Sequence, residues 1–155
     1  MEYVLSVIKS EVFITVISGV FVFVISEWIM NFIMNPKKEY SSLKERIIYT
    51  ISMYSCYYSN PYKLTKKENV RNKEEYDEAS KELRKIGSEL AGYLGNVKSK
   101  RKREKLEEVK SSLISLSNGL YEYPNYSPIQ DNKECEKNIK INLGIIKSNE
   151  KRHRN

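Results

Sequence analysis

The sequence contains few of the residues on which most catalytic and metal sites depend. Its 155 residues include one histidine and two cysteines, Cys56 and Cys135. No Cys-x-x-Cys, His-Glu-x-x-His, Gly-x-Ser-x-Gly or phosphate-loop motif occurs, so we predict no catalytic residues, no metal site and no cofactor. The only histidine, His153, lies in a polar tail, and both cysteines are expected to be buried apolar side chains. The protein is therefore predicted not to be an enzyme.

Charge is absent from Val12 to Ser26, within an apolar run that continues to Met34. A helix over 12–34 would be about 34 Å long, enough to cross a hydrocarbon core of about 30 Å. A buried helix of a soluble protein and a cleaved signal peptide are the alternatives. Only Lys9 is basic before the run, and Ser26-Glu27-Trp28 is a poor cleavage site, which argues against a signal peptide. The sequence thus predicts one transmembrane helix with Trp28 near the membrane interface.

Basic residues are scarce before the apolar run and abundant after it. Lys37, Lys38, Lys44 and Arg46 follow it closely, so we expect the N-terminus to lie outside the cell and the C-terminal domain in the reducing cytosol. Residues 35–155 carry 26 basic and 17 acidic side chains. Such a domain would be attracted to anionic lipid headgroups or to a polyanionic ligand, although solubility and membrane topology explain the excess equally well.

No segment alternates apolar and polar residues for long enough to predict a β-sheet. Instead, apolar residues recur at spacings of three and four in four segments after residue 35. These stripes are Tyr40, Leu43, Ile47, Ile51, Tyr54 and Tyr58; Tyr76, Ala79, Leu83, Ile86, Leu90 and Tyr93; Leu106, Val109, Leu113, Leu116 and Leu120; and Cys135, Ile139, Leu143 and Ile146. Because each stripe is narrow, we expect an all-α bundle of about four helices that bury the stripes together or against a second copy.

Turn-forming residues separate these helices. The first helix is expected to run from Pro36 to Asn60-Pro61, and the second from residue 74 to a stop at Gly95-Asn96. Residues 62–73 and 121–128 are predicted loops. The last helix is expected to begin at Asp131, in a capping box with Glu134. The predicted parts are a transmembrane anchor, 1–35, a cytosolic helical bundle, 36–150, and a polar tail, 151–155.

Two groups of residues in the predicted bundle are candidates for ligand binding. A cluster of cations could bind phosphates; it consists of Lys98, Lys100, Arg101, Lys102 and Arg103. Tyrosines could stack on unpaired bases; the candidates are Tyr121, Tyr123 and Tyr126, with Tyr57, Tyr58 and Tyr62 as further ones. The alternatives are a solvated linker for the cations and core or rim positions for the tyrosines.

Small and polar residues recur within the apolar run. On a helical projection one face carries Glu11, Thr15, Ser18, Gly19 and Ser26, and the other side carries Glu27 and Asn31. Such residues let transmembrane helices approach closely, so we predict a helix–helix interface or a pore lining. Ordinary variation in a single-span helix is the alternative.

Several segments resemble those of small bacterial single-pass membrane proteins. The matching residues are Pro36-x-x-Glu39-Tyr40-x-x-Leu43-Lys44-x-Arg46-Ile47, Tyr54-x-x-x-Tyr58-x-Asn60-Pro61, Ala79-Ser80-x-x-Leu83-Arg84-Lys85-Ile86-x-Ser88-x-Leu90 and Leu116-Ser117-Asn118-Gly119-Leu120. The layout is similar to that of the Hailong-type membrane effector of anti-phage defence, a homo-oligomeric channel whose cytosolic part responds to a nucleic-acid-like signal. The resemblance implies a location in the bacterial inner (plasma) membrane, a partner nucleotidyltransferase and membrane depolarisation. It covers residues 35–120 and locates no ligand site.

Two functions are consistent with these observations. The first is a homo-oligomeric, single-pass ion channel gated by a nucleotide or nucleic-acid ligand in anti-phage defence. The second is a non-conducting membrane anchor or adaptor whose helical bundle docks a protein partner.

Overall fold

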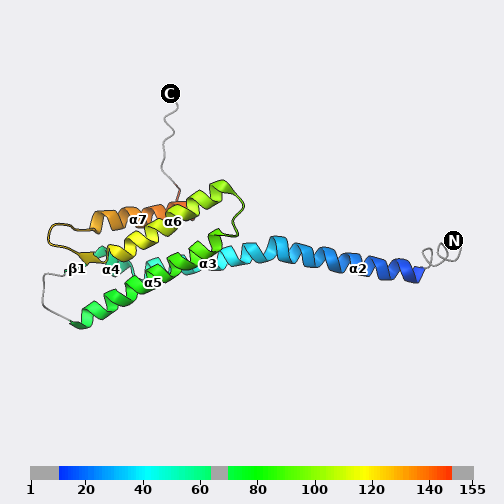
Figure 1. Cartoon of the computed structure of the whole chain (residues 1–155), viewed down its shortest axis with the longest axis horizontal. Helices are drawn as coiled ribbons and strands as arrows, with labels where there is room; N and C mark the ends of the chain where they lie inside the picture. Colours follow the sequence, from blue (N-terminus) through cyan, green and yellow to red (C-terminus); the bar gives the residue numbers. More distant parts are fainter. Residues whose placement is uncertain (1–10, 64–69, 148–155) are drawn as a thin grey trace, which may run out of the picture. The chain divides into compact units, whose positions relative to one another are not determined.

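The computed structural model describes residues 11–63 and 70–147 and consists mainly of helices (Figure 1). The chain forms two compact units, Met1–Ser42 and Leu43–Asn155. The predicted fold class is confirmed, because one long apolar N-terminal helix is followed by a helical bundle. The predicted polar tail, 151–155, lies outside the described residues.

The apolar run forms helix α2, Glu11–Ile29, and a short π-helix, η1, Met30–Met34. Helix α3, Asn35–Met53, follows without a break. The backbone N–H of Asn35 donates to the carbonyl of Met30, one residue further back than in an α-helix. Pro36 has no N–H, and its ring crowds the carbonyl four residues before it. The wider π turn lies where proline interrupts the α-helical hydrogen-bond pattern.

The predicted first stripe forms part of the bundle core. Leu43, Ile47 and Ile51 of α3 are buried, and helix α4, Ser55–Ser59, then buries Tyr58. The helix is interrupted at Tyr54, so it does not run unbroken to Asn60 as predicted.

Burial corrects two predictions about α4. The hydroxyl of Tyr58 donates to the Ile51 carbonyl at 2.9 Å, and only 1% of the residue is exposed. Tyr58 therefore offers no stacking surface. Cys56 is exposed, contrary to prediction. Tyr58 of the short helix α4 faces the core, and residues two positions apart lie on roughly opposite sides of a helix, so Cys56 faces solvent.

Helices α5, Val70–Leu94, and α6, Lys100–Asn118, pack against each other in opposite directions (Figure 1). Near one end of the pair, the hydroxyl of Ser80 donates to the Ser117 carbonyl at 3.2 Å. At the other end, Lys102 Nζ lies 3.1 Å from the Tyr93 hydroxyl. The predicted apolar stripes of both helices are buried except for the half-buried Tyr76, and the chain turns at residues 95–96 as expected. Helix α5 begins before the predicted loop was expected to end at residue 73.

Helix α7, Ile129–Asn142, runs back along α6 (Figure 1). Asn142 Nδ2 donates to Glu108 Oε2 at 2.7 Å, while Asn132 Nδ2 donates to the Gly119 carbonyl at 2.7 Å. These two bonds fix the antiparallel register of the helices, with the start of α7 beside the end of α6.

Both ends of α7 differ from the prediction. The helix begins two residues before Asp131, after Pro128, and no side chain caps it, so the capping box is wrong. Asp131 lies in the first turn, where the helix dipole favours a negative charge. At the other end Gly144 has a φ of +68°, which ends the helical phase. Ile146 is consequently 41% exposed rather than part of the core.

A two-stranded parallel sheet, which the sequence did not predict, joins two loops. Strand β1, Tyr62–Lys63, pairs with strand β2, Tyr121–Glu122, with Tyr62 opposite Tyr121. The strands are too short to show an alternating pattern, so periodicity could not reveal them.

The bundle has two chemically different ends. Arg46 Nη2 lies 2.5 Å from Glu89 Oε2, whereas the Tyr76 hydroxyl donates to the Asn60 carbonyl at 2.5 Å. The α3–α4 segment is therefore antiparallel to α5. One end, here called the basic end, holds the start of the bundle at Leu43 and the α5–α6 turn. The other, the tyrosine end, holds both strands and the start of α7.

Candidate functional site

The tyrosine end contains a hollow of about 680 Å³ between α5, α6 and α7. A neighbouring hollow of about 420 Å³ shares Arg84, Tyr121 and Tyr123 with it. We call the two together the tyrosine groove. Its lining consists of Lys73, Asp77, Ser80, Lys81, Arg84, Ser115, Ser117, Asn118, Gly119, Tyr121, Tyr123, Tyr126, Asp131, Asn132 and Cys135.

Arg84 is held in place on the groove by two hydrogen bonds to α6. Its Nε donates to Ser117 Oγ at 3.2 Å, and its Nη2 donates to Asn118 Oδ1 at 2.8 Å. A guanidinium has five N–H donors, so donors remain after these two bonds. The side chain is also exposed to solvent. Arg84 can therefore bind an anion from a fixed position without breaking its contacts with the protein.

Two tyrosine hydroxyls bind the carboxylates of the groove. Tyr121, positioned by strand β2, donates to Asp77 Oδ1, and Tyr126 donates to Asp131 Oδ2. Burial and the bond to Asp77 raise the pKa of Tyr121, while the bond to Asp131 is the main cause of the raised pKa of Tyr126. Both phenols stay protonated at neutral pH. Each carboxylate thus has a donor, and this reduces its repulsion of an anionic ligand.

Asn132 and Gly119 form a tightly fitted floor. Asn132 is 2% exposed, and its Nδ2 donates to the carbonyls of Tyr58 at 2.8 Å and Gly119 at 2.7 Å. A Cβ on residue 119 would lie 2.0 Å from Asn132 Oδ1, so only glycine fits. This contact joins the ends of α4 and α6 to the first turn of α7.

The groove offers aromatic surfaces beside a fixed cation. Tyr123 is 54% and Tyr126 51% exposed, so their rings can stack on a planar ligand. Cys135 also lines the groove, but burial raises the pKa of its thiol, which disfavours the reactive thiolate. Within 11–63 and 70–147, no group of three or more His, Cys, Asp or Glu residues could hold a metal ion. The arrangement suits binding of an aromatic ring that carries an anionic group.

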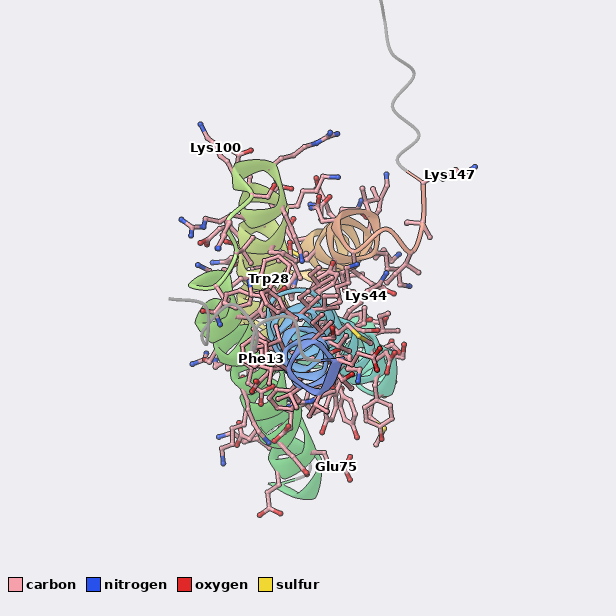
Figure 2. All side chains as sticks on the ribbon, turned by 90° about the vertical axis from the view of Figure 1, so that its right-hand side faces the viewer. Phe13, Trp28, Lys44, Glu75, Lys100 and Lys147 are labelled. Carbon is pink, nitrogen blue, oxygen red and sulfur yellow. The ribbon has the colours of Figure 1, made fainter. Side chains whose placement is uncertain are left out.

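The predicted cation cluster lies at the basic end. Ser99 caps α6, and Lys100 to Arg103 form its first turn. Lys102 lies over the Tyr93 ring at 5.4 Å, and Arg103 donates to the Val97 carbonyl at 3.1 Å. Lys98, Lys100 and Arg101 are exposed, and Figure 2 shows Lys100 pointing away from the helices.

The cations and the tyrosines are not brought together. Lys100 and Asn118 are the first and last residues of α6, and they lie about 27 Å apart along the helix axis. One nucleotide cannot contact both groups. The prediction that the cations bind phosphates remains a prediction, while the predicted tyrosines Tyr121, Tyr123 and Tyr126 share a site with Arg84.

The remaining predicted tyrosines are largely engaged with one another. Tyr57 and Tyr62 are half-buried, and both rings contact Tyr76, with centroid distances of 5.0 and 5.5 Å. The Tyr62 ring also lies 6.5 Å from that of Tyr121. Through Tyr62, this group of rings contacts the groove residue Tyr121.

The predicted interface residues of the N-terminal unit all lie on exposed helix surface. No residue of α2 or η1 is buried, and the helix beginning at Glu11 is long and apolar enough to cross a membrane, because an 18-residue stretch of it has a mean hydropathy of 2.2. Thr15 and Ser18 donate to the carbonyls four residues before them, at 2.8 and 2.7 Å. Asn31 Oδ1 accepts a hydrogen bond from Asn35 Nδ2 at 3.2 Å. Gly19 has open space where a Cβ would lie.

Sequence reasoning missed the groove residues Arg84, Asp77 and Asn132, because each occurs among other polar residues of a helix. One signal was available. The segments Ala79–Leu90 and Leu116–Leu120, on which the resemblance to membrane effectors rests, meet at the bonds from Ser80 and Arg84 to Ser117 and Asn118. Their juxtaposition locates the groove.

No family model, curated protein or solved structure matches this chain. Its function must therefore be inferred from its own residues.

Proposed function

We propose that the protein is a non-enzymatic, homo-oligomeric membrane effector with one transmembrane helix. In this proposal its cytosolic bundle binds a nucleotide or short oligonucleotide in the tyrosine groove, and binding shifts an equilibrium between closed and open states of an ion path formed by copies of α2. The resemblance described above implies that such an effector acts in bacterial anti-phage defence, at the inner membrane, with a nucleotidyltransferase as the source of the ligand.

The exposed apolar surface of α2 and η1 is the observation that carries the proposal. Val12 is 72%, Phe21 64% and Phe32 65% exposed, and no residue from Glu11 to Glu39 is buried or even half-buried. Contiguous apolar surface of this extent needs a covering, and a run of this length is suited to lipid. Small and hydroxyl residues at Thr15, Ser18 and Gly19 give copies of the helix a face for close approach.

Reconstitution of the full chain tests the proposal. The oligomeric state is measured in detergent by light scattering, and ion flux is then measured in phosphatidylcholine vesicles with and without AMP or a dinucleotide. We expect one defined oligomer and a flux that changes when a nucleotide is added. A monomer with no flux under any of these conditions would refute the proposal.

An adaptor function is favoured by a different observation. Tyr49 and Met53 of α3 are 67% and 57% exposed, and the Tyr49 hydroxyl lies 3.8 Å from Met53 Sδ. Exposed side chains of this kind are frequent where a protein partner binds. The adaptor hypothesis predicts a protein that co-purifies with the full chain, loss of that protein in Tyr49→Ser/Met53→Ser, and no ion flux.

A further inference from the structure

We propose that three exposed cations of the basic end, Lys98, Lys100 and Arg101, bind anionic lipid headgroups and hold the bundle against the membrane surface. This inference rests on the proposed function, because it requires the apolar helix to cross a bilayer. It gives the cation cluster a role separate from ligand binding in the tyrosine groove.

Chain length limits how far the basic end can lie from the membrane. Residues 35–42 connect Met34, the last residue of the apolar run, to Leu43, the first buried residue of the bundle. Even fully extended, eight residues span only about 28 Å. Leu43 lies at the basic end, since its neighbour in the same helix turn, Arg46, contacts Glu89 near the end of α5. The α5–α6 turn that carries Lys98 is therefore at the end of the bundle to which this short connection is attached.

The chemistry of the basic end fits a charged surface better than a nucleic acid. Among its residues Tyr93 is only 8% exposed, and its ring lies beneath Lys102, so this ring is not open for base stacking. Neither hollow of the tyrosine groove includes a residue of this end. Lys98, Lys100 and Arg101 lie on one turn and at the start of one helix. Each cation near an anionic leaflet adds attraction, and a planar array of headgroups needs no cavity.

The test uses the full chain in nanodiscs of two compositions, phosphatidylcholine alone and phosphatidylcholine with about one third phosphatidylglycerol. Backbone hydrogen exchange is followed by mass spectrometry in the peptide that covers 95–106. The test variant is Lys100→Gln/Arg101→Gln. The control variant, Lys133→Gln/Lys137→Gln, removes the same charge from two exposed residues of α7. A third condition adds a 20-nucleotide single-stranded DNA to discs without phosphatidylglycerol.

We expect exchange in 95–106 to be about threefold slower with phosphatidylglycerol, because the cations are attracted to the anionic headgroups. The control variant should keep this protection, and Lys100→Gln/Arg101→Gln should lose it. Equal exchange in both lipids, or protection by DNA alone, overturns the inference while leaving a membrane-inserted chain intact. A chain that does not enter the nanodiscs overturns both this inference and the proposed function.

Discussion

Asn132 shows how much of the groove depends on one buried side chain. Its Nδ2 donates to two carbonyls from segments far apart in sequence, that of Tyr58 in α4 and that of Gly119 just after α6. A buried amide that meets its partners in one geometry specifies how three segments come together. Replacing it leaves buried carbonyls without a donor, which costs more than the bonds themselves contribute.

We expect Asn132→Ala to lower the free energy of unfolding by about 2–3 kcal/mol, because two buried carbonyls lose their donor. Gly119→Ala should also destabilise, since the new Cβ would overlap Asn132 Oδ1. The double variant should lose less than the sum of the two, because the overlap disappears with the asparagine. Denaturant unfolding of the full chain in detergent, followed by circular dichroism, measures all three. The exposed Asn138→Ala is the control, and an equal loss there would contradict this account.

The buried phenol of Tyr58 should make the folded protein less stable at alkaline pH. Burial is the main cause of its raised pKa, and the nearby Glu136 carboxylate adds to it. Since the folded-state pKa is above the unfolded value of about 10, stability is complete below pH 10 and falls above it, by up to about 1.4 kcal/mol per pH unit. Tyr58→Phe should be less stable at pH 7, having lost the bond to Ile51, but should show a shallower alkaline decline. An unchanged slope, compared with Tyr49→Phe, would exclude Tyr58 as its source.

Arg84 and the exposed tyrosines predict how ligand binding responds to substitution. Arg84→Gln should weaken binding of AMP at least about tenfold and leave adenosine nearly unaffected, because only AMP carries the anionic group. Tyr123→Leu should weaken both by about 1–3 kcal/mol through lost stacking. Calorimetry on the full chain in detergent measures each affinity. Tyr49→Leu, outside the groove, is the control, and a response to it equal to that of Tyr123→Leu would reject the groove as the site.

Among the helices, α2 should be the least tolerant of charged residues. Val20→Arg/Val24→Arg places two charges in the apolar run, each costing about 2.5–3.5 kcal/mol of insertion free energy. We expect most of this variant to leave the membrane fraction in cell fractionation. Ile145→Arg/Ile146→Arg makes the same change at two partly exposed bundle residues and should stay membrane-bound. Equal partitioning of the two variants would contradict a transmembrane α2.

Helices could be predicted from the sequence because their burial follows a period that the chain displays. Leu83, Leu90, Leu113 and Ile139 were placed in the core from spacing alone, and all are buried. Spacing gave no information about features that depend on one local conformation or one distant contact. Gly144 turns Ile146 out of the core, and β1 pairs with β2 across more than fifty residues. The three groove tyrosines were found from loop composition. Arg84, their cationic partner, was not, because a helix surface rich in charge hides one functional arginine.

At the scale of the whole molecule, the two ends of the bundle suggest a division of labour. The tyrosine groove would recognise a ligand, and the basic end would keep the bundle next to the lipid surface. Helix α6 connects the two ends, with Ser99 capping its start and Asn118 bound to Arg84 near its end. In the proposed channel, a ligand could shift the equilibrium between closed and open states only by as much as its affinity differs between the two states. That difference, measured for AMP in open and closed states, sets the upper limit of gating.

The most direct test of the account is the topology of a single thiol. Cys135→Ser leaves Cys56, which is exposed on the bundle, as the only cysteine. A membrane-impermeant maleimide is applied to intact cells and to cells whose membranes have been opened. The control for background labelling is Cys56→Ser/Cys135→Ser, which has no cysteine. The account predicts a membrane-bound protein in which Cys56 is labelled only after the membrane is opened. Labelling of Cys56 in intact cells, or recovery of the protein in the soluble fraction, would contradict it.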